Sequence, residues 1–325
     1  MNLDVAIERF PIRGRFAIAR GARTDAEVVV ATLKADGLTG RGECVPYARY
    51  GETPQDVAAA IAAMADRLEG LDRKALQTAM PAGAARNALD CALIDLDCKR
   101  AGVDAAQLLS VDPGSGHILT AYTISLDTPQ AMARAALDAA RFPLLKIKLG
   151  GAGDGERLAA IRAALPQTRL IVDANEAWSP QSLETMLAAC ADHAVELVEQ
   201  PLPAGGDAAL TPGRHPFAIC ADESVHDLAS LDAIADRYDA INVKLDKTGG
   251  LTHALTLIAA ARARGLKVMV GCMLGTSLGA APALVAARLA DWVDLDGPLL
   301  LASDRSPAIT YQDGRLLDPA RGLWG

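Results

Sequence analysis

Three apolar segments decide the fold of this sequence: LLKIKLG (144–150), RLIVDAN (169–175) and VELVEQP (195–201). Ala-rich segments with helical periodicity separate them, at 156–165 and 181–191. Strand–helix alternation of this kind predicts parallel pairing of the strands. Each strand ends in a charged residue, and Lys148, Asp173 and Glu199 follow one another at intervals of 25 and 26 positions. One strand–helix unit therefore occupies about 25 residues.

The same alternation extends through residues 116–300. Five further apolar strands are expected at TAYTISL (120–126), FAICADES (217–224), AINVKLDK (240–247), LKVMVGCM (266–273) and DWVDLDG (291–297). Asp222, Lys244 and Asp294 continue the series of charged strand ends. In a barrel, residues at the ends of many strands form the active site. In an open sheet, the ligand binds at the one point where the strand order reverses. The pattern predicts an α/β fold with a TIM-like barrel.

The first 115 residues have a different pattern. Strands are expected at 3–10 and 27–34, the second followed by a glycine-rich hairpin turn. Helices are expected from Thr53-Pro54 onward and over 84–101, where Gly102 follows the end of the second one. Residues 1–115 are therefore predicted to form an α+β unit. The segment 301–325, beyond the last barrel strand, is expected to return to it.

Composition limits the class of partner. The 325 residues contain 32 Lys and Arg against 40 Asp and Glu, a net charge of −8, and only 4% aromatic residues. Nucleic acid is therefore not an expected partner. We expect no membrane span or secretory signal, because no long apolar run is present, and we expect a cytoplasmic protein. The six cysteines form no CxxC pair and are expected to be buried thiols. A homo-oligomer is left open.

Three carboxylates end successive strands: Asp173, Glu199 and Asp222. A single carboxylate at such a position most often caps the next helix, but three in succession favour a common site. Oxygen ligands without His or Cys suit Mg²⁺. Converging like charges also repel unless a cation compensates them. The pattern predicts that these three residues bind Mg²⁺.

Two lysines flank the carboxylates in the strand order. Lys148 shares a strand face with Lys146, and Lys244 ends a later strand. Burial, Mg²⁺ and Lys146 are expected to lower the pKa of such a lysine, so that it accepts a proton near neutral pH. A metal that binds a carboxylate makes the adjacent C–H more acidic. With one base on each face of the resulting planar carbon, the predicted reaction is racemisation or epimerisation α to a carboxylate.

The sequence resembles the enolase superfamily, muconate-lactonizing subgroup, in six motifs that occur in this order: KIKLG, VDANEAW, VEQPLP, ADES, NVKLDKTGGL and GCMLGTSLG. More narrowly, it resembles the dipeptide epimerases, and the resemblance includes GECVPYARYGET and PAGAARNALDCALIDLD near the N-terminus. This resemblance implies a (β/α)₇β barrel with an α+β capping domain. It also implies a Mg²⁺-dependent isomerase of cell-wall peptide metabolism, which inverts the α-carbon of the C-terminal residue of Ala-Glu-type dipeptides by two-lysine proton transfer through an enediolate.

The resemblance implies a role for each candidate residue. Asp173, Glu199 and Asp222 would bind the metal, and Lys148 and Lys244 would be the general acid and base. The residues expected to bind substrate are Arg23, Thr123, Lys146, Cys272, Leu274, Asp294 and Asp296. Among these, Lys146 would contact the substrate carboxylate, and Asp294 and Asp296 would bind its α-ammonium. Arg23 would pair with a glutamate side chain of the substrate, although an arginine in a polar loop is most often simply solvated.

Two alternatives remain open. One is an N-acylamino acid racemase or an o-succinylbenzoate synthase-like enzyme of the same superfamily, whose substrate has no ammonium group for Asp294 to bind. The other is a catalytically silent binding protein that keeps the barrel and its metal. Replacement of Lys148 or Lys244 would then change nothing beyond binding.

Overall fold

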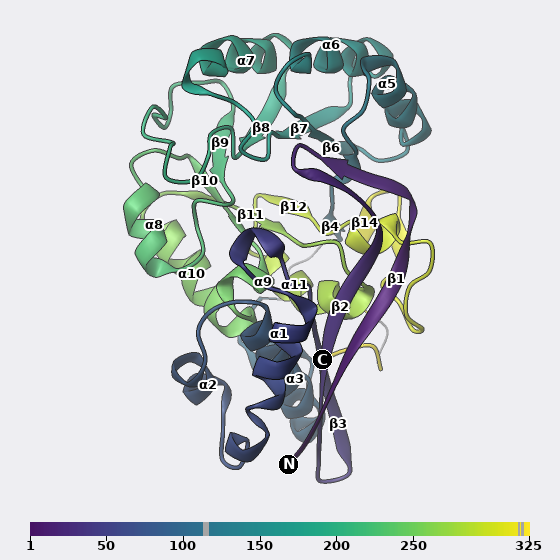
Figure 1. Ribbon diagram of the computed structural model, residues 1–325, viewed down its shortest axis with the longest axis vertical. Helices are drawn as coiled ribbons and strands as arrows, with labels where there is room; N and C mark the ends of the chain where they lie inside the picture. Colours follow the sequence, from purple (N-terminus) through teal and green to yellow (C-terminus); the bar gives the residue numbers. More distant parts are fainter. Residues whose placement is uncertain (113–116, 318, 320–321) are drawn as a thin grey trace.

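The computed structural model describes residues 1–112, 117–317, 319 and 322–325. Within these residues an eight-stranded parallel sheet runs in chain order through β5 (Tyr122–Ile124), β6 (Leu144–Lys148), β7 (Arg169–Asp173), β8 (Val195–Glu199), β9 (Ala218–Ala221), β10 (Ala240–Val243), β11 (Lys267–Gly271) and β12 (Trp292–Asp294). The N–H of Ala121, beside β5, donates to the carbonyl oxygen of Val293 in β12 at 2.8 Å. This contact closes the sheet into a barrel and confirms the predicted fold class (Figure 1).

Helices cover the outside of the barrel (Figure 1). They are α5 (Pro129–Asp138), α6 (Asp154–Ala164), α7 (Pro180–Asp192), α8 (Leu228–Ile234), α9 (Leu245–Thr248), α10 (Leu251–Ala263) and α11 (Ser277–Ala287). The connection from β8 to β9, residues 200–217, is a loop without a helix. Several helices begin at a capping side chain, as at Ser179, where a capping box starts α7.

The barrel interior has an apolar bottom and a polar top. Small and medium apolar side chains form the bottom layer: Ala121, Leu144, Ile171, Leu197, Ala218, Cys220, Ala240 and Met269. Side chains two positions apart on a strand share a face, so Leu144 is followed inside the barrel by Lys146, and Ile171 by Asp173. The strand-end charges therefore point into the barrel above a packed floor, at the end where barrel enzymes bind substrate.

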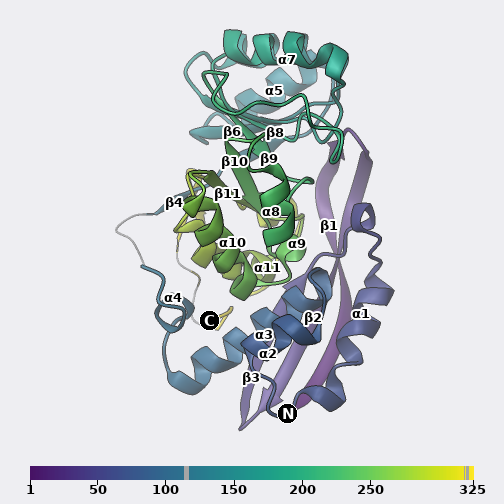
Figure 2. The same cartoon turned by 90° about the vertical axis from the view of Figure 1, so that its left-hand side faces the viewer.

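The N-terminal unit lies against one end of the barrel (Figure 2). Its antiparallel sheet consists of β1 (Asn2–Ile18), β2 (Gly21–Ala35) and β3 (Leu38–Cys44). Its helices are η1 (Ala48–Tyr50), α1 (Pro54–Ala62), η2 (Ala65–Arg67), α2 (Arg73–Ala79), α3 (Ala84–Ala101) and α4 (Ala105–Leu108). The predicted starts of α1 and α3 are confirmed, and Thr53 caps α1 as expected. β1 and β2 are longer than predicted, because their hairpin extends past residue 10 to reach the barrel.

The C-terminal segment contacts both parts of the molecule. It contains η3 (Gly297–Leu300), β13 (Tyr311–Gln312) and β14 (Arg315–Leu316), which pairs with β4 (Ile118–Leu119) beside the barrel. The indole N–H of Trp324 donates to the carbonyl of Cys91 in α3 at 3.0 Å. The domain boundary expected at residue 115 lies outside the described residues, so the domain limits stay predictions. None of the helices in the described ranges has the length and apolar character needed to span a bilayer.

Gly42 lets α3 pack directly on β3. A Cβ atom at this position would lie 2.0 Å from the carbonyl oxygen of Ala88 and 2.7 Å from the backbone nitrogen of Ala92. Both are backbone atoms of one helix, so neither can move without displacing the helix. A glycine is therefore required here by close approach of the two elements.

We expect Gly42→Ala to destabilise the protein by about 1–3 kcal/mol, since overpacking forces the helix away from the sheet. Gly155→Ala is the matched control, because it lies in α6 and its added Cβ would meet only the Ala189 side chain at 3.9 Å. Thermal unfolding followed by circular dichroism measures both. The account of this contact is wrong if Gly42→Ala unfolds at the wild-type temperature.

Candidate active site

The polar layer at the top of the barrel is densely charged. Lys148 donates to Asp173 at 2.6 Å, on the neighbouring strand. Lys244, which directly follows β10, donates to Asp222 at 2.6 Å. Both lysines and both carboxylates are buried. The structure therefore brings together predicted site residues that are up to 96 positions apart in the sequence.

Lys146 occupies the centre of this layer. Its Nζ atom lies 2.6 Å from a Glu199 oxygen, 2.7 Å from an Asp294 oxygen and 3.3 Å from an Asp173 oxygen. The side chain is 1% exposed. One ammonium thus links carboxylates from β7, β8 and β12, which places the predicted strand-end residues around a common point.

Lys148 and Lys244 approach that point from opposite sides of the barrel. In the closed eight-stranded sheet, β6 and β10 are four strands apart, so they lie across the barrel from each other. The strands between them on one side are β7, β8 and β9, which position Asp173, Glu199 and Asp222. The two amines therefore flank the three carboxylates, as the strand order predicted.

Charge crowding perturbs the carboxylates in opposite directions. Burial, and then repulsion by Asp173, raises the pKa of Glu199 to about 7. Burial also opposes ionisation of Asp222, but attraction to Lys244 and Lys247 holds its pKa well below the usual value. Glu199 is therefore the carboxylate whose negative charge the surrounding protein compensates least.

Nearby carboxylates control the pKa of the buried lysines in this structure. Burial lowers the pKa of Lys244, as predicted, but attraction to Asp222 and Glu199 outweighs burial and raises the pKa well above its usual value. Lys146 behaves in the same way beside Asp294 and Glu199. These directions hold for the site without a cation, where each amine is bound by carboxylates. The lowered lysine pKa expected beside bound Mg²⁺ stays a prediction.

The three carboxylates fit the chemistry of Mg²⁺ by their donor atoms. The described residues contain no group of three or more His, Cys, Asp or Glu side chains already arranged as metal ligands, and each of the three acids contacts a lysine instead. Oε2 of Glu199 is buried and accepts no hydrogen bond, although Lys146 lies close to it in an ion pair. A buried carboxylate with a raised pKa, whose oxygen faces an ammonium but accepts no well-directed hydrogen bond, suits a hard cation.

Asp294 and Asp296 lie beside the charged layer. Oδ1 of Asp294 is buried without a hydrogen-bond partner, while Oδ2 contacts Lys146. Asp296 accepts the backbone N–H of Thr123 at 2.6 Å. Burial, and then the charge of Asp294, raises the pKa of Asp296 to about 7. The pair therefore has acceptor capacity for a cationic group.

A cavity of about 460 Å³ opens above this layer, between barrel and cap. The barrel contributes Lys148, Lys244, Cys272 and Leu274 to its wall, and the cap contributes Arg23. Six of the predicted site residues are not among the described residues that line this cavity: Thr123, Lys146, Asp173, Glu199, Asp294 and Asp296. Cys272 is half-buried, and the other five cysteines are buried thiols as predicted.

Several polar residues of the site were not predicted from the sequence. Lys247 is fully buried and donates to the side chain of Asp222 at 2.6 Å, and Asn242 donates to Glu199 at 2.8 Å. Asn242 lies on β10 two positions before Lys244, so a search for polar residues on the same strand face would have found it. Lys247 lies in α9, three positions after Lys244, where strand alternation does not apply. Glu176 and Glu223 lie within the motifs VDANEAW and ADES, next to the predicted metal ligands. Their arginine partner Arg20 comes from the distant cap, and no local pattern in the sequence indicates that contact.

Comparison with known families matches both parts of the chain. Residues 2–110 match the mandelate racemase/muconate lactonizing enzyme N-terminal domain, and residues 129–322 match the enolase C-terminal domain-like family. The chain is 47% identical over 318 residues to L-Ala-D/L-Glu epimerase of Escherichia coli, covering 97% of this chain and 99% of the relative. It is 42% identical to an N-acetyl-D-glutamate racemase of Pseudoalteromonas, covering 92% and 95%.

Solved structures agree with these matches. An enolase family member from Agrobacterium tumefaciens with homology to dipeptide epimerases, solved with bound sodium and L-Ala-L-Glu, superposes with a TM-score of 0.96 at 52% identity over 99% of each chain. A dipeptide epimerase from Cytophaga hutchinsonii, solved with Mg and D-Ala-L-Val, has a TM-score of 0.92 at 27% identity, over 99% of this chain and 94% of that one. The similarity extends over both domains.

Proposed function

The chain belongs to the mandelate racemase/muconate lactonizing enzyme group of the enolase superfamily, and from this premise we propose that it is a Mg²⁺-dependent dipeptide epimerase. It is an isomerase, and its substrate is a dipeptide of the Ala-Glu type. The observation that carries this proposal is the position of Lys148 and Lys244 on opposite sides of the barrel, each beside the carboxylate cluster.

In this proposal the two lysines transfer protons and the three carboxylates bind the metal. One lysine removes the α-proton from one face of the substrate carbon, and the other, as an ammonium, returns a proton to the opposite face. The roles exchange in the reverse direction, so no net proton is consumed. Asp173, Glu199 and Asp222 would hold Mg²⁺, which supplies positive charge beside the substrate carboxylate and so makes the neighbouring C–H more acidic.

Other side chains orient the substrate in this proposal. Lys146 would donate to the substrate carboxylate, and Asp294 with Asp296 would accept hydrogen bonds from the α-ammonium. Arg23, in the cap, would pair with a side-chain carboxylate of the C-terminal residue. Support for this last role is that Arg23 lines the cavity and forms no ion pair with a described residue. Thr123, Cys272 and Leu274 would complete the substrate contacts. A role in cell-wall peptide metabolism and a cytoplasmic location are proposed from the sequence.

A mass-shift screen in D₂O tests the function. We expect the α-carbon of the C-terminal residue to gain one deuterium when Ala-Glu and related Xaa-Glu dipeptides are incubated with the enzyme and Mg²⁺. Neutral dipeptides should exchange more slowly, since they have no group for Arg23 to bind. No exchange with any Xaa-Glu dipeptide would exclude the proposed function.

The second candidate is an N-acylamino acid racemase, favoured by the 42% identity to an N-acetyl-D-glutamate racemase. Asp294→Asn separates the two functions, because it removes the charge and keeps the size of the side chain. For a dipeptide epimerase we expect kcat/KM on Ala-Glu to fall about 10- to 100-fold, the effect of one charge-assisted hydrogen bond. Steady-state kinetics on N-acetylglutamate provide the control. An unchanged rate on Ala-Glu would contradict the proposed ammonium site.

A further inference from the structure

The tip of the β1–β2 hairpin crosses the mouth of the barrel. The tip, residues 16–23, supplies much of the cap wall of the cavity. On one side, Ala17 accepts the N–H of Leu126 at 3.0 Å, in the loop after β5. On the other side, Arg20 extends over the loops after β7 and β9. Ala19, Gly21 and Ala22 are exposed, so the tip itself buries little apolar surface.

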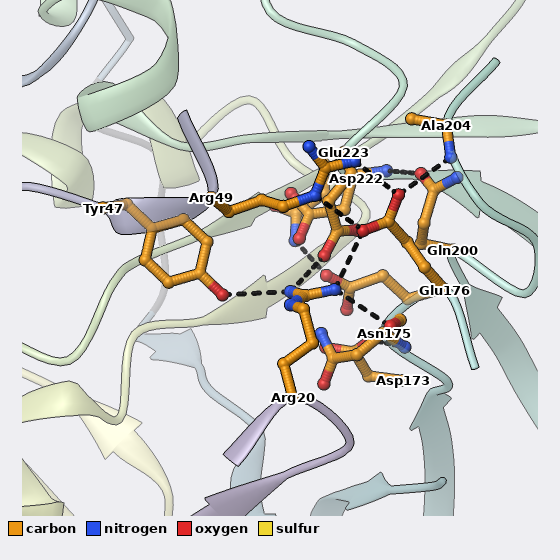
Figure 3. A network of polar contacts seen from close by, with 12 residues as sticks. Arg20, Tyr47, Arg49, Asp173, Asn175, Glu176, Gln200, Ala204, Asp222 and Glu223 are labelled. Atoms are coloured by element: carbon orange, nitrogen blue, oxygen red, sulfur yellow. Dashed lines mark hydrogen bonds and ion pairs between the residues drawn. The ribbon is translucent and has the colours of Figure 1, made fainter. Parts of the chain in front are cut away.

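Arg20 anchors the tip on that second side (Figure 3). Its guanidinium donates to the Glu223 carboxylate at 2.5 Å, to the Glu176 carboxylate at 3.0 Å and to the backbone oxygen of Asn175 at 2.9 Å. It also donates to the hydroxyl of Tyr47 at 3.0 Å. Glu223 is 1% exposed and Glu176 is 10% exposed, so these ion pairs are shielded from water much more than a surface pair.

Glu176 joins this anchor to a second cap loop. It accepts two hydrogen bonds from Arg49 in η1, at 2.9 Å and 3.0 Å, and one from the backbone N–H of Ala204 at 2.8 Å. The carboxylate of Glu176 is therefore shared by the hairpin tip, by η1 and by the loop after β8. Arg20, Arg49, Glu176 and Glu223 are together called the latch below.

The backbone at Glu176 adopts an unfavourable conformation for a residue with a side chain. Asn175 has a φ of 45° and Glu176 has a φ of 68°, in the left-handed region that favours glycine. Backbone strain of this kind persists only where contacts with the surrounding structure hold the residue in the strained conformation. Here the strained turn directs the Glu176 carboxylate toward both arginines (Figure 3).

Of the three cap arginines among the described residues that line the cavity, the latch pairs Arg20 and Arg49 with carboxylates and leaves Arg23 without an ion pair. The two arginines and two glutamates of the latch balance in charge. Arg23 lies three positions after Arg20, and among the described residues it makes a cation–π contact with Tyr47, 5.9 Å from the ring, but no ion pair. Holding Arg20 in place therefore holds Arg23 at the cavity wall with its charge available to a ligand.

We propose that Glu176 is a positioning residue, which holds the hairpin tip and η1 closed over the cavity through Arg20 and Arg49 and thereby presents Arg23 to an anionic substrate side chain. The proposal deepens the proposed function and rests on it for the identity of the substrate. Glu176 touches no reacting atom in this account.

Four variants test the role by steady-state kinetics: Glu176→Gln, Glu176→Gly, Arg20→Gln and the double variant Arg20→Gln/Glu176→Gln. We expect each single variant to lower kcat/KM on Ala-Glu about 10-fold, mainly by raising KM, since each loses charge-assisted hydrogen bonds. The loss on Ala-Ala should be smaller, because that substrate does not need Arg23. The double variant should lose no more kcat/KM than the more impaired single variant, since both substitutions disrupt the same ion-pair network.

Two controls separate positioning from folding. Glu176→Gly relieves the left-handed backbone and loses the same contacts as Glu176→Gln, so it should unfold at or above the temperature of Glu176→Gln and still lose activity. Arg9→Gln breaks an ion pair with Glu27 on the same hairpin, whose side chains are 65% and 41% exposed, and should keep wild-type kinetics. Wild-type kcat/KM in both Glu176 variants, or losses that simply add in the double variant, would overturn the proposal.

Limited trypsin digestion measures how often the hairpin tip opens, and it needs no substrate. We expect cleavage after Arg20 or Arg23 to be several-fold faster in Glu176→Gln than in the wild type, because the tip opens more often. Equal cleavage rates would overturn the latch. Faster cleavage in a protein that turns over no dipeptide would remove the proposed function and leave the loop-holding role of Glu176 standing.

Discussion

Replacement of Lys148 or Lys244 by alanine will abolish epimerisation of Ala-Glu in both directions. Each turnover needs both amines, one to remove the α-proton and one to return a proton on the other face. We expect a loss of at least about 10³-fold, within the range that a positioned acid or base contributes. Chiral analysis of the dipeptide after incubation with each variant measures it.

The two lysine variants should still differ from each other. Each retains one amine, so each should exchange the α-hydrogen of one epimer with solvent, and the two variants should exchange opposite epimers. Lys34→Ala is the control, because Lys34 forms an exposed ion pair with Asp4 in the cap sheet. If both variants exchanged the same epimer, the lysines would lie on one face of the substrate. If neither lost activity, the chain would be a binding protein.

Replacement of Glu199 by glutamine will remove the response to Mg²⁺. Among the three predicted metal ligands, Glu199 alone combines a raised pKa with a buried oxygen that accepts no hydrogen bond, so we expect it to gain most from the cation. The wild type should unfold at a higher temperature with Mg²⁺ than with a chelator, because a ligand at 100 times its Kd adds about 2.7 kcal/mol. The variant should lose this shift and at least about 10³-fold in activity.

The unfolding temperatures of the wild type and of Glu199→Gln in the presence of a chelator provide a second comparison. Glu199→Gln removes one of several converging negative charges, so without Mg²⁺ it should unfold no earlier than the wild type. Glu196→Gln is the matched control on the same strand, since Glu196 pairs with Arg169 outside the barrel. Differential scanning calorimetry with and without EDTA measures all three proteins. A normal Mg²⁺ shift in Glu199→Gln would exclude this residue as a ligand.

The barrel was predicted correctly because the pattern that identifies it lies within short segments of the sequence. An apolar strand with a charged last residue recurs every 22 to 26 positions between Lys148 and Lys244, and parallel strands bring their ends to one edge. The structure confirms the barrel and places Asp173, Glu199 and Asp222 in one layer. The functional assignment of these residues remains a proposal.

The features that were not predicted depend on contacts between residues that are far apart in the sequence. Arg20 and Glu176 are 156 positions apart, and neither has a local pattern that identifies the other. The length of the β1–β2 hairpin was underestimated because Pro11 and Gly14 interrupt the strand pattern, and the pairing shifts between Pro11 and Phe16.

Isotope analysis of the first turnovers by the wild-type enzyme tests the two-face geometry most directly. Each epimer of Ala-Glu is incubated in D₂O with Mg²⁺, and the α-position is examined in the product and in the recovered substrate. The account predicts deuterium in the product from the first turnover in both directions, because the incoming proton comes from an amine that did not receive the outgoing one. Protium carried from substrate into product would show a single base on one face and would contradict the account.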